Sequence, residues 1–280
     1  MSAPVVPPTR PPVPAYGVLG RLLPSGPPPR AMSLLERNMR AYRRAWLLLL
    51  SGFVEPVMYL FGLGIGLGQL VGDVTTDSGR LVPYALFVAP ALMASAAMNG
   101  AVFDSTFNVF FKLKYSRLYD SVLATPLGPR DVAVGETSWA LVRGSLYAAA
   151  FFVVLALAGL VRTPWALLML PSALLVGWAF ASVGMAVTTY MRSWQDLDVV
   201  QIAIVPLFLF SATFYPVSTY PTSVAWLVQL SPLYHGVALL RGCALEDLGW
   251  GLLGHAAVLV GLGLAGVAVT ERRLRSLLLR

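Results

Sequence analysis

Charged residues and cysteine are scarce in this sequence. Only 12% of its 280 residues are Asp, Glu, Lys or Arg, about half of the roughly 25% that soluble domains carry. The single cysteine, Cys243, excludes an intrachain disulfide and a cysteine-based metal cluster. The sequence has no GxxxxGK[ST], HExxH or lipase-type GxSxG motif. We interpret His235 and His255 as isolated packed or interfacial residues, and we expect no catalytic residue and no metal site.

Hydrophobic residues, in contrast, make up 57% of the chain, and its mean hydropathy is +0.72. A membrane-spanning helix needs about 20 apolar residues, so this length leaves room for about six spans and short loops. We therefore predict an all-α, polytopic membrane protein. Its six transmembrane helices are expected at about 46–67, 83–107, 134–161, 165–190, 199–214 and 250–269.

The stretch that follows the fifth expected span is apolar but broken. No Asp, Glu, Lys or Arg occurs between 199 and 240, yet Pro216, Pro221 and Pro232 interrupt the run. Irregular backbone at membrane depth is tolerated only against protein or a water-filled cavity. We predict segments that dip into the outer leaflet without crossing it, which form an extracellular re-entrant hairpin.

The distribution of basic residues predicts the orientation. With six spans and both termini inside, 16 Lys and Arg lie on the cytoplasmic side, and only Arg80, Arg162 and Arg241 lie outside. This bias follows the positive-inside rule, and a seventh span would reverse it for the basic tail. We therefore interpret the net charge of +7 as orientation information, not as affinity for nucleic acid. The expected location is the plasma (cytoplasmic) membrane.

Two segments precede the first expected span. Residues 1–30 are proline-rich and predict a disordered cytoplasmic tail. Residues 31–46 predict an amphipathic helix that lies along the lipid headgroups; a simple cytoplasmic extension of the first span is the alternative. Its polar residues include Glu36, Arg37, Arg40, Arg43 and Arg44.

Residues 111–136 form the longest polar stretch between two apolar ones. Tyr115, Leu118, Tyr119 and Val122 recur at helical spacing, which predicts a short amphipathic helix that ends before Pro126. The stretch is either a docking surface for a soluble partner or a solvated loop without one, and its residues alone favour neither.

A few polar residues fall inside the expected spans. Glu55 either lines a substrate path or is held by a neighbouring helix for packing, and packing is slightly favoured. Asp104 is expected to pair with Lys112 or Lys114. Charged residues at the start of the third span, Glu136 and Arg143, are expected to reach the membrane interface.

Three stretches together resemble one family of transporters. They are VEPVMYLFGLGIGLG in the first span, YSRLYDSVLATPLGPRDVAVGE in the polar stretch, and PLFLFSATFYPVSTYP followed by LSPLYHGVALLRG. They are similar to the type-2 ABC exporter permeases, in particular to the lipooligosaccharide and nodulation-factor export branch (nodulation protein J-like), with polyketide-antibiotic efflux permeases nearby. The resemblance covers about residues 31–275. Ala212 stands where many relatives carry glycine.

The resemblance implies that residues 31–280 are the transmembrane domain of an exporter. The domain would pair with a second copy or a sister permease and bind a separate ATPase subunit that holds ATP and Mg. Its cargo would be a lipid-linked glycan, a lipooligosaccharide or an amphipathic drug. The residues expected to couple to the ATPase are Lys112, Lys114, Tyr115, Arg117, Leu118, Tyr119, Thr125 and Pro126. Residues 33–44 would be the connecting helix.

The resemblance also implies an outer gate in the re-entrant hairpin. Its expected residues are Phe214, Tyr215, Pro216, Pro221, Pro232, Tyr234 and His235. Candidates for the translocation path lie on the first, second and fifth spans and include Glu55, Asn99 and Asp104.

Two other functions remain open at this point. One is a proton-coupled secondary transporter that uses Glu55 or Asp104 as the proton carrier, although no internal repeat supports it. The other is a membrane scaffold without transport activity, which would have no need of a broken outer hairpin.

Overall fold

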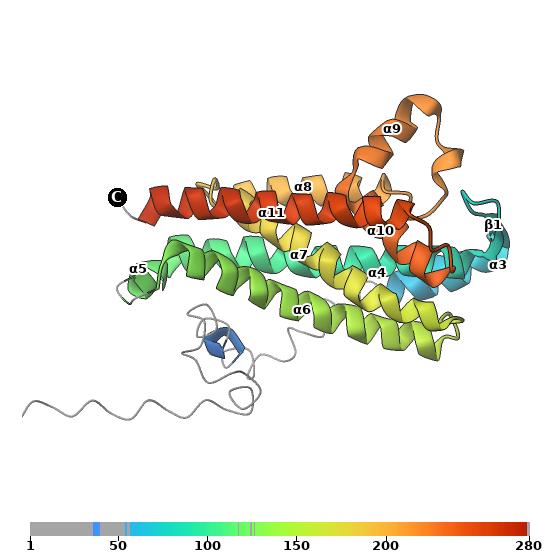
Figure 1. The fold of residues 1–280 in the computed structure, drawn as a ribbon, viewed down its shortest axis with the longest axis horizontal. Coiled ribbons are helices and arrows are strands. Elements are labelled where there is room, and N and C mark those ends of the chain that lie inside the picture. The colour runs from blue at the N-terminus through green and yellow to red at the C-terminus, as the bar shows by residue number, and fades with distance from the viewer. Residues whose placement is uncertain are drawn as a thin grey trace, which may run out of the picture.

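The computed structural model describes residues 36–39, 54, 57–116, 118–123, 125 and 127–278. Most of these residues are helical, and the long helices run side by side in one elongated bundle (Figure 1). In chain order the elements are η2 (Leu60–Leu67), α3 (Gly68–Val71), β1 (Asp73–Thr75), β2 (Leu81–Pro83), α4 (Tyr84–Phe103), η3 (Asp104–Asn108), η4 (Phe111–Tyr115), α5 (Leu118–Leu123), α6 (Pro129–Leu157), η5 (Pro164–Leu168), α7 (Met169–Thr188), α8 (Asp196–Leu209), η6 (Val217–Thr219), α9 (Thr222–Leu230), α10 (Pro232–Ala244) and α11 (Gly251–Leu278).

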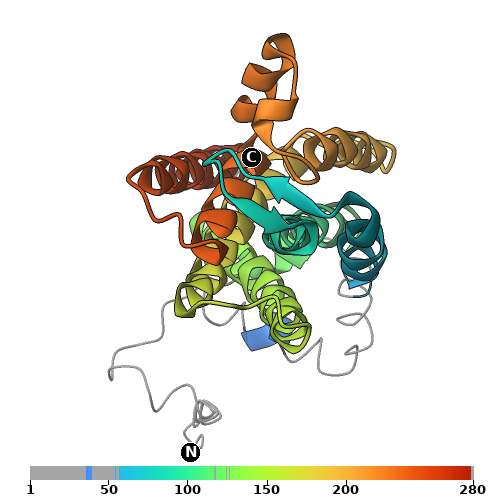
Figure 2. The ribbon, with the colours of Figure 1, turned by 90° about the vertical axis from the view of Figure 1, so that its right-hand side faces the viewer.

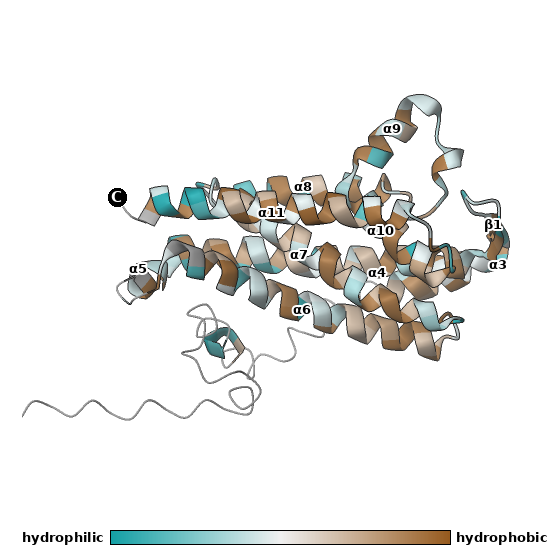
Figure 3. Cartoon of the chain, viewed as in Figure 1, coloured by the Kyte–Doolittle hydropathy of each residue, from teal (hydrophilic) through white to brown (hydrophobic). Residues whose placement is uncertain are grey.

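Four helices in the described ranges are long and apolar enough to cross a membrane, or five if the bent pair α9–α10 is one span. They correspond to the second, third, fourth and sixth expected spans, so the polytopic membrane class is confirmed. Figure 3 shows hydrophobic residues along the length of the bundle and hydrophilic ones at the C-terminal end of α11. The four spans are Tyr84–Tyr115, Asp131–Leu157, Pro164–Thr188 and Gly251–Leu277.

The first and fifth expected spans are shorter in the described residues. The first is described as an apolar helix at Val57–Val71, and most of its expected earlier half lies outside the described residues. The fifth is α8, which has 14 residues and contains Pro206. The count of six spans therefore stays a prediction.

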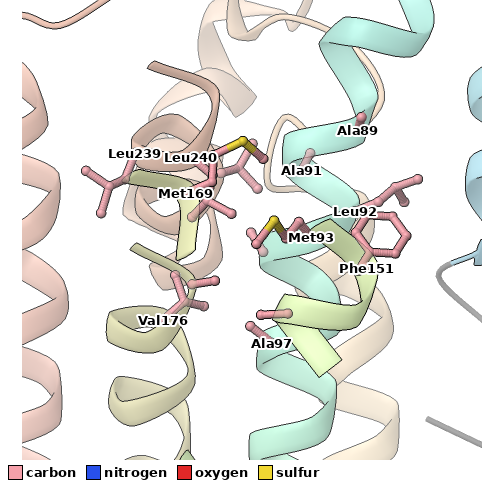
Figure 4. Packing of buried hydrophobic residues seen from close by; sticks show 14 of the residues in the cluster. Ala89, Ala91, Leu92, Met93, Ala97, Phe151, Met169, Val176, Leu239 and Leu240 are labelled. Atoms are coloured by element: carbon pink, nitrogen blue, oxygen red, sulfur yellow. The ribbon is translucent and has the colours of Figure 1, made fainter. Parts of the chain in front are cut away.

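Helix α4 forms the centre of the bundle. It is apolar on all sides, and 89% of its most apolar 18-residue stretch is buried, as expected for a helix surrounded by others. It packs against α6, α7 and α10, and Figure 2 shows it near the middle of the bundle. Figure 4 shows the interlocking side chains of this core, which include Leu92, Met93, Ala97, Phe151, Met169, Val176, Leu239 and Leu240.

Helices α7 and α11 form the most extensive helix–helix contact, and it depends on small residues. A Cβ atom at Gly266 would lie 2.6 Å from the carbonyl carbon of Ser182. Only glycine permits this backbone approach, as in other membrane helix pairs with small residues at the contact.

The helix that begins at Tyr84 is longer than expected. The second span was predicted to end near residue 107, but the helix continues through the π-helical turns η3 and η4 to Tyr115. The third helix likewise begins at Pro129, before the expected 134. Its start is set by proline in the first turn and by Asp131, which accepts a hydrogen bond from the Gly128 N–H at 2.9 Å.

The chain breaks after α8, as the prolines predicted. Each proline stands at a helix start: Pro216 precedes η6, Pro221 precedes α9 and Pro232 opens α10. Helices α9 and α10 meet at an angle of 85°. Ala212 has a φ of +55°, a left-handed conformation that favours glycine.

A two-stranded antiparallel sheet, unpredicted, occupies the short loop after α3. Strand β1 pairs with β2 with Val74 opposite Val82. The Asp77 carboxylate in the turn accepts hydrogen bonds from the backbone N–H groups of Ser218 (3.1 Å) and Val217 (3.4 Å). The hairpin thereby ties the loop to the segment that precedes α9.

Candidate functional site

The expected coupling segment has a buried face and an exposed face. Tyr119 and Val122 are buried, and Leu118 is half-buried, so the predicted apolar face is confirmed for these three residues. They pack in a cluster with Val109, Val132, Ala133, Met185 and Leu274. Tyr115 does not share this face, because 59% of it is exposed.

The exposed face carries the residues that a partner can reach. Lys114, Tyr115 and Thr125 are exposed. Arg117 and Pro126, also predicted for coupling, lie outside the described residues.

Lys112 points into the protein, contrary to a role as a surface contact. Its Nζ lies 2.7 Å from Oε2 of Glu136 on α6, and the two side chains are 14% and 1% exposed. Glu136 therefore does not reach the membrane interface as expected. It holds the end of the Tyr84–Tyr115 helix against the start of α6.

The N-terminal helix meets the same carboxylate. Residues 36–39 are helical; Asn38 Nδ2 donates to Glu136 Oε2 at 3.1 Å, and Arg37 lies 3.6 Å from Oε1. Lys112 also donates to Asn38 Oδ1 at 3.3 Å. Glu36 is half-buried, while Arg40, Arg43 and Arg44 lie outside the described residues. Glu136 thus joins the predicted interfacial helix, the coupling segment and α6.

Tyr119 of α5 completes this junction. Burial raises its pKa well above the usual value, and the charge of Glu136 raises the pKa further. The phenol is therefore neutral, and its hydroxyl is buried with no hydrogen-bond partner among the described residues. We name the five residues Arg37, Asn38, Lys112, Tyr119 and Glu136 the Glu136 junction.

A second buried ion pair lies deeper along the same two helices. Arg143 Nη1 is 2.6 Å from Asp104 Oδ1, with the two side chains 5% and 2% exposed. Asn108 donates to the same oxygen at 3.0 Å, and Arg143 donates to the Tyr147 hydroxyl at 2.9 Å. The expected pairing of Asp104 with Lys112 or Lys114 is therefore wrong, and Arg143 pairs inside the bundle where it was expected to reach the membrane interface. The pair neutralises both charges inside the bundle.

A groove of about 610 Å³ opens beside α4. It is lined by the three elements predicted to form the path: the first apolar helix, the Tyr84–Tyr115 helix and α8. Asn99 is among the lining residues, and its Oδ1 is buried with no hydrogen-bond partner among the described residues. Asp104 does not line the groove, and Glu55 lies outside the described residues. The other lining residues are Tyr59, Leu63, Leu67, Tyr84, Leu92, Ser95, Ala96, Ile204, Val205, Phe208, Leu209, Phe214 and Tyr215.

The residues predicted for an outer gate lie at the other end of the bundle from α5 (Figure 1). Phe214 and Tyr215 line the groove, and Tyr215 packs on Tyr220 with ring centroids 4.7 Å apart. Tyr234 and His235 lie on the first turn of α10. Arg241, counted among the residues on the extracellular side, donates to the carbonyls of Phe87 (3.2 Å) and Ala212 (2.8 Å). It thereby ties α4 to the non-helical segment after α8.

Sequence reasoning missed Glu136 and Arg143 as structural residues. Their seven-residue spacing, which places both on nearly one helical face, was the available signal. When an acid and a base lie buried on one face of a helix, a neighbouring helix must supply partners of opposite charge. Here Lys112 is the partner of Glu136, and Asp104 is the partner of Arg143.

The apolar bundle, with two ion pairs buried between its helices, defines the chain as a multi-pass membrane protein. The model of the ABC-2 type transporter family matches residues 30–245. The chain belongs to this family, and it is a permease subunit without ATPase motifs of its own.

Several curated relatives support this assignment. Nodulation protein J of Sinorhizobium fredii is 33% identical over 230 residues, which cover 81% of this chain and 86% of the relative. Nodulation protein J of Rhizobium leguminosarum bv. viciae is 34% identical over 214 residues, 75% of this chain and 80% of the relative. That of Rhizobium meliloti is 31% identical over 214 residues, 75% of this chain and 79% of the relative. These names confirm the nodulation protein J-like branch.

Proposed function

We propose that this ABC-2 permease exports an amphipathic molecule, such as a lipid-linked glycan, a lipooligosaccharide or a drug, together with a separate ATPase subunit. The ATPase binds ATP and Mg and docks on the exposed face of the coupling segment. Both termini and this segment face the cytoplasm, six spans cross the membrane, and the α9–α10 hairpin is re-entrant on the outer side. A second copy or a sister permease completes the transporter.

One observation carries the proposal. The continuous helix Tyr84–Tyr115 lines the groove with Leu92, Ser95, Ala96 and Asn99, and the same helix ends in the exposed Tyr115. A force applied to the coupling segment therefore acts on the wall of the groove through this one helix. The Glu136 junction transmits the same movement to α6 and the N-terminal helix.

The chemistry of the groove supports the substrate class. Its lining is mostly aliphatic and aromatic, with few polar groups, among them Asn99, Ser95 and the Tyr59 hydroxyl. Such a lining suits a molecule with an apolar chain and a polar group that hydrogen-bonds to Asn99. The name nodulation protein J of the relatives is consistent with a lipid-linked saccharide.

Proton-coupled transport receives less support. Asp104, one of its two expected carriers, is fixed by Arg143 at 2.6 Å and does not line the groove. Glu55, the other expected carrier, lies outside the described residues. Loss of a proton-driven flux in Glu55→Gln would be the evidence for proton-coupled transport through this residue.

The decisive experiment combines co-purification with charge reversal at the coupling segment. Gentle purification from native membranes followed by mass spectrometry should recover a Walker-A-bearing ATPase at about one copy per permease. In proteoliposomes made from that complex, Lys114→Glu with Arg117→Glu should abolish transport and uncouple ATP hydrolysis from substrate.

The matched control reverses an exposed cation elsewhere. Arg162 is exposed in the turn between α6 and α7, at the end of the bundle away from α5 (Figure 1). Arg162→Glu should leave transport unchanged. Normal transport in the Lys114 and Arg117 double variant would rule out the coupling assignment, and a permease that co-purifies without any ATPase would rule out the partner.

A further inference from the structure

The chain has two histidines, and the structure brings them together. His235 lies on the first turn of α10 and His255 on the second turn of α11, and their Nδ1 atoms are 2.7 Å apart. Tyr234 stands edge-on to both imidazoles, with its ring centroid 5.6 Å from each. The pair joins the α9–α10 hairpin to the last helix.

The contacts of the pair assign its protons. Two ring nitrogens at this distance form a hydrogen bond only if one donates and the other accepts. In the neutral pair one ring therefore carries its proton on Nδ1 and donates, and the other carries its proton on Nε2 and accepts at Nδ1. Nε2 of the donor ring remains an acceptor.

Charged groups of both signs lie near His255. This residue lines a cavity of about 360 Å³ at the end of the bundle away from α5. The cavity wall includes the carboxyl groups of Asp77, from the β1–β2 turn, and Asp247, from the α10–α11 loop, together with the Tyr234 phenol. Its one Arg, Arg241 of α10, is directed to the Phe87 and Ala212 carbonyls.

We propose that the His235–His255 pair is a proton-binding site that makes the packing of α10 against α11 depend on pH. A first proton adds to Nε2 of the donor ring and leaves the bond between the rings in place, now charge-assisted. A second proton would occupy Nδ1 of the acceptor ring and set two cations against each other. The bond is then lost, and the first turn of α10 separates from α11.

The test uses the full chain with an affinity tag that lacks histidine. In lipid nanodiscs, ¹⁵N-histidine labelling yields imidazole signals from these two residues alone. Between about pH 4 and about pH 8 the pair should titrate in two linked steps. In His235→Gln the remaining His255 should titrate in one step, displaced by about one pH unit or more. Two histidines that titrate independently, each unaffected by removal of the other, would overturn the proposal.

A stability measurement distinguishes proton uptake from simple packing. His255→Asn keeps an N–H donor near the position of Nδ1 but cannot take up a proton from the cavity. Thermal unfolding midpoints should fall more steeply on acidification in the wild type than in His255→Asn. Parallel curves for the wild type and His255→Asn would refute the pH dependence. In the NMR experiment, ¹⁵N signals that change on addition of equimolar zinc, and not of acid, would assign the pair to metal binding instead.

Discussion

Glutamine in place of Glu136 removes one charge from the Glu136 junction and preserves the shape of the side chain. In the wild type this carboxylate is almost fully buried and lies 2.7 Å from Lys112 Nζ. The substitution leaves Lys112 as a largely buried cation without its counter-ion. The substituted glutamine side chain retains a carbonyl oxygen that can accept from Asn38.

The expected loss of stability follows from the burial of the two partners. Removing one member of a buried ion pair costs about 3–5 kcal/mol. Lys112 is 14% exposed, and its long side chain can move its ammonium group toward water, which reduces the penalty. Arg37 is 37% exposed and 3.6 Å away, so its contact adds less than about 1 kcal/mol. We expect Glu136→Gln to lose about 2–3 kcal/mol of unfolding free energy.

The assay is reversible unfolding of the purified permease in mixed detergent micelles, with a second substitution as a rescue. Lys112→Met combined with Glu136→Gln removes both charges and should recover most of the loss. The matched control is Glu271→Gln on α11, whose partner Arg275 is 62% exposed at 2.6 Å. That exposed pair, four residues apart, contributes only about 0.3–0.5 kcal/mol.

The reasoning fails if Glu136→Gln costs no more than Glu271→Gln. It also fails if Lys112→Met deepens the loss, because the cost would then not come from an unpaired lysine. In proteoliposomes with the ATPase, the Glu136→Gln permease should bind its partner but transport less per ATP hydrolysed, since the coupling segment is no longer held against α6.

Three further changes test the core and the groove. Arg143→Leu should cost about 3–5 kcal/mol in chemical unfolding because it strands Asp104 inside the bundle, and adding Asp104→Leu should restore much of it; a double variant as unstable as the single one would contradict a pair. Gly266→Ala should lose about 1–3 kcal/mol in unfolding free energy through backbone overlap with α7, whereas Gly261→Ala, where a Cβ meets open space, should gain up to about 1 kcal/mol; equal effects would contradict the close approach. Asn99→Leu should leave thermal stability unchanged or higher, since it removes an unpartnered buried oxygen, while transport falls; unchanged transport would remove Asn99 from the path.

Hydropathy was sufficient to locate the long helices but not to end them. The span expected at 165–190 appears as the helix Pro164–Thr188. The Tyr84–Tyr115 helix, in contrast, runs past the expected end, because backbone hydrogen bonding continues where side chains become polar. A hydropathy pattern marks the edge of the hydrocarbon region, and helix ends follow from local features such as Pro129 and the Asp131 cap.

In the coupling segment, spacing predicted the burial of apolar residues better than that of the lysine. Leu118, Tyr119 and Val122 face inward as their helical spacing indicated, since apolar residues that share a face must be covered. Lys112 has a long side chain that can reach either water or a buried carboxylate. Its direction depends on Glu136, and the sequence does not say that these two residues are neighbours. The same reason hid the contact between the two histidines.

The two buried ion pairs together fix how the Tyr84–Tyr115 helix lies against α6. The Tyr84–Tyr115 helix carries an acid at Asp104 and a base at Lys112. Helix α6 runs antiparallel to it and carries a base at Arg143 and an acid at Glu136. The pairs are eight residues apart on one helix and seven on the other, or about two turns. A slip by that distance would bring Asp104 to Glu136, two carboxylates in a buried place, and leave the other charges unpaired. This arrangement of charges therefore specifies one register, and that register sets the position of the coupling segment along α6.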